Sequence, residues 1–286
     1  MFSNAGKNGT PANYVWIKKM MKPFVILALL LAAGVTQAFD HSHGSWDDLL
    51  KRHVVLISNG NSSQVDYAGM QSDHVILASY LDSLSAVTEQ EYQGWTKTER
   101  LAFLINAYNA FTIELILTEY PDIQSIKDLG NLFRSPWKRQ FFSLLGVPRH
   151  LDNLEHDLIR TPGVFDEPRI HFALNCASIG CPMLRNEAFT DEHLNTQLES
   201  GINRFLSDHS RNRFDPSSNS LLVSPIFDWY GRDFELGHNG FTSLKDTFAK
   251  YADRLTDDPG SRLRIRSGNY GIVFLDYDWS LNDTRE

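Results

Sequence analysis

The chain has 286 residues, of which 42% are hydrophobic and 12% aromatic, and its formal net charge is −8 at pH 7. An acidic balance disfavours a nucleic-acid partner, because it repels the phosphate backbone and no basic stripe with interleaved aromatic residues offsets it. A chain of this length buries a sizeable core, so we expect one main domain.

The N-terminal segment has a different composition from the rest of the chain. Lys22 precedes an apolar run over residues 24–35, and the small residues up to Ala38 are typical of a signal-peptidase site. We therefore predict an exported protein, periplasmic or secreted, with no stable membrane anchor after cleavage; an uncleaved anchor is the alternative. The predicted divisions are upstream residues plus a signal peptide (1–38), an N-terminal lead-in (39–60) and the main domain (61–286).

The strongest helical signal covers residues 97–119, where apolar residues recur at three- and four-residue steps. Thr96 or Thr98 can cap this helix, and Pro121 ends it. Asn106 and Asn109 point the same way from it, which requires a reason because asparagine is a poor residue for a helix interior. Either these amides hold neighbouring loops, or they line a binding site and orient a substrate or catalytic group.

Other elements are predicted from shorter patterns. Asp152 is the expected N-cap of a short helix over residues 153–160, Pro168 opens another helix, and Cys181 before Pro182 is a candidate N-cap. The remaining predicted helices cover 46–53, 73–85, 190–207, 228–234 and 241–252, and the extended segments cover 65–67, 147–151, 213–214, 220–224 and 271–276. The predicted fold class is α+β, a mostly helical single domain with a small antiparallel sheet.

Three segments, in this order, resemble signature blocks of the DUF547 family: LAFLINAYNAFTI (101–113), LDNLEHDLIR (151–160) and HFALNCASIGCP (171–182). SPIFDWYGRDF (224–234) and YDWSLN (277–282) are supporting matches. One departure is Leu104, where the family often has tryptophan. The resemblance implies a domain of unknown function whose cysteine and histidine pattern is similar to that of papain-like thiol hydrolases, and so a papain-like fold is one possibility.

A thiol hydrolase needs a cysteine thiolate, a histidine that accepts its proton and a group that orients the imidazole. Helix-terminal placement favours Cys181 as the nucleophile, whereas the resemblance favours Cys176, because plant members keep the first cysteine and have serine at the second. We predict Cys176 as nucleophile and His156 as base, acting on an amide, peptide or thioester bond. The remaining candidates for the base or the orienting group are His171, Glu155, Asn106 and Asn109.

Other interpretations of the same residues remain open. Cys176 and Cys181 could form a disulfide, either structural or redox-active, and the domain could be a non-catalytic module that binds a ligand or a protein. Asp228, Trp229 and Tyr230 are expected in the wall of a cleft for a peptide or small polar thiol. His41 and His43 are poor metal candidates without further ligands, and no phosphate-binding loop is present, so neither a metal nor a cofactor is predicted.

Overall fold

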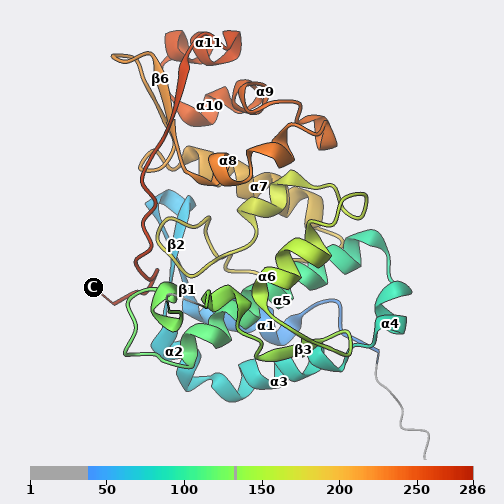
Figure 1. Cartoon of the computed structure of the whole chain (residues 1–286). Helices are drawn as coiled ribbons and strands as arrows, with labels where there is room; N and C mark the ends of the chain where they lie inside the picture. Colours follow the sequence, from blue (N-terminus) through green and yellow to red (C-terminus); the bar gives the residue numbers. More distant parts are fainter. Residues whose placement is uncertain (1–37, 132–133, 286) are drawn as a thin grey trace, which may run out of the picture. The chain divides into compact units, whose positions relative to one another are not determined.

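The computed structural model describes residues 38–131 and 134–285, and Phe39–Glu286 form one compact unit (Figure 1). The predicted signal segment lies outside the described residues, except for Ala38. Residues 39–60 take part in this unit, since Trp46 and Leu49 are fully buried in its larger core. The predicted fold class is confirmed: helices dominate, and the strands form three small sheets.

Helix α5, Lys97–Leu117, runs through the larger core, and from Leu101 onward all its residues except Glu114 are buried. Its first turn carries a capping box, in which Thr96 accepts from the N–H of Glu99 and the Glu99 carboxylate accepts from the N–H of Thr96. By length and composition α5 could cross a membrane, but 89% of its apolar window is buried inside the structure. It is therefore the core helix of this domain, and it begins at the predicted residue 97 and ends at Leu117, close to the predicted end at 119.

Short helices and two hairpins surround α5. The predicted extended segment over 65–67 is wrong at its end, because the Asp66 carboxylate accepts from the N–H of Gly69 and Tyr67 is already helical. The elements are α1 (Gly44–His53), the hairpin of β1 (Val54–Ile57) and β2 (Ser62–Val65), α2 (Tyr67–Ser72), α3 (His74–Ala86), α4 (Glu89–Gln93), and the hairpin of β3 (Phe142–Leu144) and β4 (Val147–Arg149).

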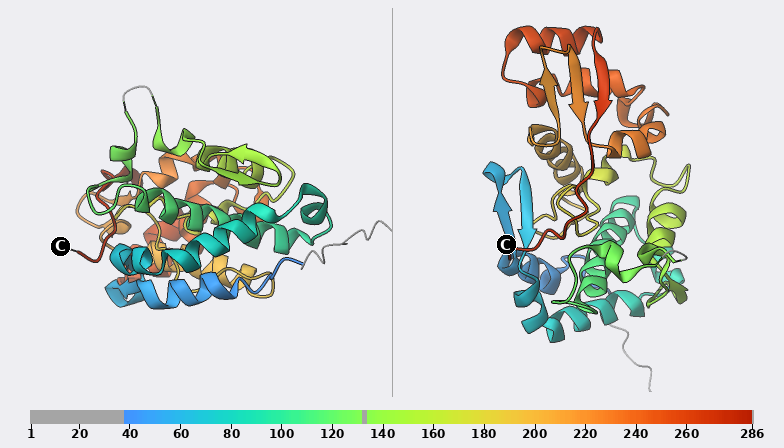
Figure 2. Two further views of the ribbon diagram at one scale, coloured as in Figure 1. Left: turned by 90° about the horizontal axis from the view of Figure 1, so that it is seen from below. Right: turned by 60° about the vertical axis from the view of Figure 1, so that its left-hand side comes forward.

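A second, phenylalanine-rich core lies in the C-terminal half. Figure 2 shows its three-stranded sheet in order β5–β6–β7, in which β5 and β6 are antiparallel but β6 and β7 are parallel. The parallel pair arises because the chain between β6 and β7 passes through four α-helices and two 3₁₀ helices and returns in the same direction. The elements are α7 (Leu194–Ser207), β5 (Arg213–Asp215), β6 (Ser220–Val223), α8 (Ile226–Trp229), α9 (Leu244–Lys250), α10 (Ala252–Leu255), α11 (Pro259–Ser267) and β7 (Gly271–Phe274).

Three predictions for residues 150–182 are corrected by the structure. His150, not Asp152, caps the short helix: its Nδ1 accepts from the N–H of Asn153 at 2.9 Å, and α6 (Leu151–Asn153) continues as a π-helical turn, Leu154–Ile159. The helix that opens at Pro168 is a 3₁₀ helix and ends at Phe172. No helix follows Cys181, because the next segment is held in an extended loop by distant side chains.

The C-terminal tail crosses back from the second core to the first (Figure 2). After β7, Leu275 donates to Val223, and further along the N–H of Leu281 donates to the carbonyl of Gln124. On the way it pairs with the turn between the two cysteines, where the N–H groups of Ile179 and Gly180 donate to carbonyls of the tail. The tail therefore brings aromatic residues at its start beside the cysteine turn.

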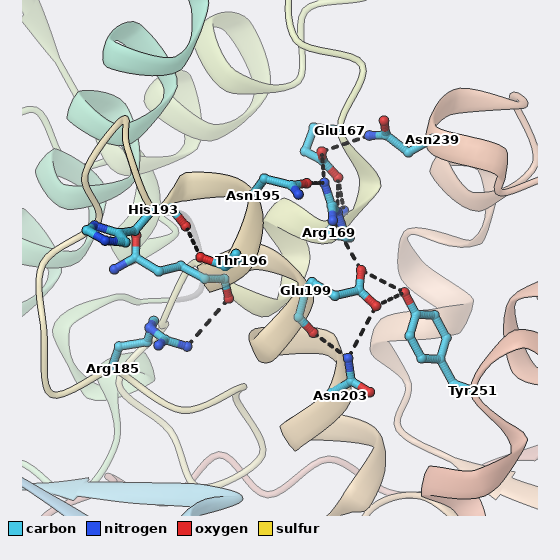
Figure 3. Close-up of polar contacts among 11 residues, drawn as sticks. Glu167, Arg169, Arg185, His193, Asn195, Thr196, Glu199, Asn203, Asn239 and Tyr251 are labelled. Carbon is cyan, nitrogen blue, oxygen red and sulfur yellow. Dashed lines mark hydrogen bonds and ion pairs between the residues drawn. The ribbon is translucent and has the colours of Figure 1, made fainter.

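A buried ion-pair network connects α7 with the C-terminal helices, and Figure 3 shows it. Arg169 donates to Glu167 at 2.7 Å and to Glu199 of α7 at 3.1 Å. Tyr251, next to α10, donates to the same Glu199 carboxylate at 2.9 Å. The hydrogen bonds and charge of Glu167 and Glu199 raise the pKa of Arg169 despite its burial, so the guanidinium stays charged.

Candidate functional site

A pocket of about 220 Å³ lies where α5, the π-helical turn, the cysteine turn, α8 and the C-terminal tail meet. It brings together most of the residues that the sequence singles out, from Glu155 to Tyr230, although these lie on separate elements of the chain. The lining residues are Tyr108, Ser135, Trp137, Asp152, Glu155, His156, His171, Leu174, Cys176, Cys181, Pro182, Ile226, Trp229, Tyr230, Tyr277 and Trp279.

Cys176 and Cys181 form a disulfide, with their Cα atoms 6.1 Å apart, and neither is free. The bridge forms part of the pocket wall. The two sulfurs differ in access: Cys176 is half-buried, whereas Cys181 is only 5% exposed. The predicted disulfide alternative is therefore the state of this structure, and the more accessible half of the bridge is Cys176.

Polar hydrogens surround both sulfur atoms. The hydroxyls of Tyr277 and Ser178 each lie 3.2 Å from Sγ of Cys176; Ser178 donates to the Tyr277 hydroxyl, so the Tyr277 proton is the one that the disulfide sulfur can accept. Burial raises the pKa of Tyr277 to about 12, so its hydroxyl stays protonated at neutral pH. On the other side, Sγ of Cys181 accepts from the backbone N–H of Cys176 at 2.8 Å. Each sulfur thus has a donor that could stabilise a thiolate.

Asparagine side chains hold the cysteine turn in place. Asn109 of α5 accepts from the N–H of Asn175 and donates to the carbonyl of Ala173, both at 2.9 Å. Asn175 in turn accepts from the N–H of Ala177, which adopts a left-handed conformation with φ 59°. Asn106, one turn earlier on α5, binds both backbone groups of Phe189. Both predicted asparagines therefore fix loops beneath the pocket, and neither lines it.

The turn also depends on a glycine. An added Cβ at Gly180 would lie 2.9 Å from the ring of Tyr277 and 2.9 Å from the carbonyl oxygen of Asp278. Only glycine therefore allows the tail to pass so close to the turn. This contact sets the position of the Tyr277 hydroxyl against the disulfide.

His156 lines the pocket, but its hydrogen bond defines an unexpected tautomer. Nη1 of Arg160 lies 2.6 Å from Nδ1 of His156, and a guanidinium can only donate. Nδ1 is therefore the acceptor, and the proton of the neutral ring is on Nε2. In this state the ring offers a donor rather than the lone pair that a general base needs.

His171 lines the pocket and belongs to a buried hydrogen-bond network. Its Nε2 lies 2.8 Å from the Asp233 carboxylate, which also forms an ion pair with Arg160 at 2.9 Å. Burial lowers the pKa of His171, and Asp233 offsets only part of that effect. Burial by itself raises the pKa of Asp233, but the hydrogen bonds from His171 and Arg160 hold it well below its usual range. The ring of His171 also stacks on Tyr230, with centroids 3.9 Å apart.

Aromatic residues form one wall of the pocket. Trp229 and Tyr230, which the sequence analysis expects in a cleft wall, line the pocket, whereas the neighbouring Asp228 is exposed and does not line it. Trp279 stacks on Trp229 with centroids 5.8 Å apart and lies 4.5 Å from Tyr277. Sequence reasoning did not assign Tyr277, Trp279, Tyr108 or Asp233 to the site; the signal for the first two was their place in the YDWSLN match.

The two N-terminal histidines, His41 and His43, do not line this pocket. His43 is buried, with Nδ1 2.7 Å from the Tyr80 hydroxyl, and burial lowers its pKa to about 3. His41 packs edge-on against Trp95. Within residues 38–131 and 134–285, no group of three or more histidine, cysteine, aspartate or glutamate side chains could hold a metal ion.

Comparison with protein-family models matches residues 92–206 to the model described as "Protein of unknown function, DUF547". The matched range contains α5, the π-helical turn and both cysteines. No curated protein and no solved structure matches the chain. Trp229, Tyr230, Tyr277 and Trp279, which complete the pocket, lie beyond the matched range.

Proposed function

Because the chain belongs to the DUF547 family over residues 92–206, and the family description assigns no activity, we infer its function from the pocket. We propose that the Cys176–Cys181 bridge is a redox-active disulfide that exchanges with a small or peptidic thiol bound there. The observation that most supports this proposal is the asymmetry of the bridge: both cysteines line the pocket, but Cys176 is half-buried whereas Cys181 is only 5% exposed. Thiol–disulfide exchange requires one cysteine that a substrate sulfur can reach, and a less exposed partner suits the role of the resolving cysteine.

The exchange balances without any further oxidant. A substrate thiolate, having lost its proton to water, attacks Sγ of Cys176; a mixed disulfide forms and the Cys176–Cys181 bond breaks. Cys181 leaves as a thiolate, which the backbone N–H of Cys176 stabilises until it takes a proton from water. A second substrate thiolate attacks the substrate sulfur, which releases a substrate disulfide and leaves Cys176 as a thiolate beside Tyr277 and Ser178. Two thiols are oxidised and the protein disulfide is reduced; the reverse sequence reduces a disulfide.

The test is the reactivity of single-cysteine variants of the full chain. Cys181→Ser leaves the accessible cysteine, and Cys176→Ser is the matched control that leaves the buried one. With oxidised glutathione we expect Cys181→Ser to form a mixed disulfide at least about tenfold faster, followed by intact mass. Tyr277→Phe in the Cys181→Ser background should slow this reaction about tenfold, because a donor to the thiolate is lost. Equal rates for the two single variants would reject the proposal.

The wild-type bridge gives a second measurement. In glutathione buffers we expect it to equilibrate at a potential of roughly −120 to −270 mV, the range of exchange-active proteins. A bridge that stays oxidised in a buffer poised below about −300 mV is a structural disulfide, and that result would also reject a redox role.

The predicted cysteine hydrolase is the second candidate, and one observation favours it: Cys176 and His156 line the same pocket. Hydrolysis by this mechanism requires that the Cys176–Cys181 disulfide be reduced. It also requires that Arg160 move, because its guanidinium donates a hydrogen bond to Nδ1 of His156 in this structure. We expect hydrolysis of a fluorogenic amide or thioester only with reductant present, and loss of that activity in Cys176→Ala. Activity that survives in Cys176→Ala would eliminate this candidate.

We also propose that the protein works after export, in the periplasm or outside the cell. A disulfide is compatible with an oxidising compartment, and the apolar run over residues 24–35 is typical of a signal peptide. Fractionation of the producing cells, followed by N-terminal sequencing, tests this: the expected mature N-terminus is Phe39. Recovery of uncleaved protein in the cytoplasm would contradict it.

A further inference from the structure

The charges that line the pocket are unbalanced. Among the lining residues of the described chain, Asp152 and Glu155 are carboxylates, and none is lysine or arginine. Arg160 is already paired with Asp233 at 2.9 Å and at 3.1 Å, and His171 is buried against the same aspartate. Nε2 of His156 lies 3.8 Å from Asp152, and Lys127 adds one positive charge over the ring of Trp279, against the two carboxylates. The pocket therefore presents a net negative charge to a ligand.

Glu155 is the more informative of the two acids. It is only 7% exposed, and the hydroxyls of Tyr108 and Tyr230 donate to its carboxylate, but no lysine, arginine or histidine in the described parts of the chain forms an ion pair with it. Other acidic side chains of similar burial have one: Glu167 pairs with Arg169 at 2.7 Å and Asp208 with Arg211 at 2.5 Å. A buried carboxylate is costly without a cation, so an unpaired one in the wall of a cavity indicates a partner that arrives from outside.

The surroundings of Glu155 suit an organic cation. Burial, and next the charge of Glu155, raise the pKa of the Tyr108 and Tyr230 hydroxyls. The aromatic rings of the wall already attract cations within the chain: Lys127 Nζ lies 3.7 Å from the ring centroid of Trp279, and the Arg160 guanidinium lies 4.8 Å from that of Tyr230. Aromatic rings beside carboxylates are the usual environment for ammonium groups.

We propose that the pocket binds the ammonium group of a small organic amine, held by Glu155 and the aromatic wall of Trp229, Tyr277 and Trp279. A pocket of about 220 Å³ lies below the usual range of drug-sized sites, about 300–1,000 Å³, so the bound part is a head group rather than a large ligand. Where this rests on the proposed disulfide exchange, the substrate is a thiol that carries an amine, since Cys176 lines the same pocket.

The test measures binding to the oxidised full chain with ligands that contain no sulfur. Choline carries a quaternary ammonium, and 3,3-dimethylbutan-1-ol has the same shape without the charge. We expect choline to quench tryptophan fluorescence with saturation, confirmed by calorimetry, and the neutral alcohol to bind at least about tenfold more weakly. Equal affinity for the two ligands, or no saturable binding of choline, overturns the proposal.

Variants assign the charge to Glu155. Glu155→Gln keeps the shape of the side chain and should weaken choline binding about tenfold, while binding of the neutral alcohol stays the same. Glu192→Gln, at an exposed glutamate outside the pocket, is the matched control and should bind as the wild type does. If Glu155→Gln does not fold, Asp152→Asn replaces the half-buried acid of the same wall and should weaken choline binding by a smaller factor. Unchanged choline affinity in the folded variant overturns the assignment.

The two proposals fail separately. Choline binding does not depend on the thiol chemistry, and glutathione exchange in Cys181→Ser does not depend on choline. Normal exchange without choline binding rejects only the cation site. Choline binding by a protein whose disulfide does not exchange rejects only the redox function, and the pocket is then a binding site for an organic cation.

Discussion

Reduction of the Cys176–Cys181 bridge should leave the protein folded. The bridge closes a loop of sequence separation 5, and the chain-entropy relation gives such a short loop only about 2 kcal/mol of stabilisation at 25 °C. Other contacts hold the same turn: Asn109 and Asn175 bind its backbone, and the N–H groups of Ile179 and Gly180 pair with the tail. A redox site must survive both states, and this turn is built to do so.

Urea unfolding followed by tryptophan fluorescence measures the difference. With a phosphine reductant, the midpoint should fall by about 1 M or less, because urea m-values for domains are about 1–3 kcal/mol per M and rise with size. The double variant Cys176→Ala/Cys181→Ala, without reductant, should unfold at the same midpoint as the reduced wild type. A reduced protein that is unfolded without urea, or that loses more than about 5 kcal/mol, would refute the reasoning and indicate a structural bridge.

Three further predictions concern stability. Arg169→Met should destabilise the protein by about 2–4 kcal/mol in calorimetry, because Glu167 and Glu199 lose the cation that they share; the Glu199 side chain is partly exposed to water, which limits the loss. Arg264→Met, at an exposed site, is the control and should have no effect. Burial lowers the pKa of His43 to about 3, so below about pH 6.5 the unfolded chain binds a proton at this residue that the folded protein does not. The free energy of unfolding should therefore fall, by at most about 1.4 kcal/mol per pH unit, as the pH drops from about 6.5 towards 3. His43→Gln should make that dependence on pH flatter, and an unchanged slope contradicts the assignment. Asn109→Ala should cost about 1–3 kcal/mol and speed amide exchange at Asn175, whereas slow exchange would mean that the turn does not need this side chain.

Local sequence patterns predicted many of the helices and strands. The capping residue of α5 and its end before Pro121 were readable because a capping box and a proline act within a few residues of the chain. The strands of the C-terminal sheet were likewise visible as short apolar runs. Their parallel pairing was not, because it depends on how many helices lie between β6 and β7 and on where the chain returns.

The errors fall where the hydrogen-bond partner of a backbone group depends on the geometry of the folded chain. Asp152 looked like an N-cap, but His150 is the residue whose ring faces the free N–H of Asn153. Cys181 followed by Pro182 suggested a helix start, but the carbonyl of Pro182 is bound by Asn175 and the segment stays extended. The sequence pattern does not show which of these groups is within reach in the folded chain, and so it predicted a helix after Cys181 that does not form.

The sequence by itself determined the α+β class, the position of the core helix, the resemblance to the DUF547 family and the set of polar residues from which a site could be built. Only the tertiary structure decided how they combine. The Cys176–Cys181 distance and the Arg160 contact that sets the tautomer of His156 depend on the backbone path that the folded chain takes there, and the tail places Tyr277 against the sulfur from 101 positions away. The physical reason is that reactivity depends on distances and on burial, and both are set by how the segments pack in the folded protein.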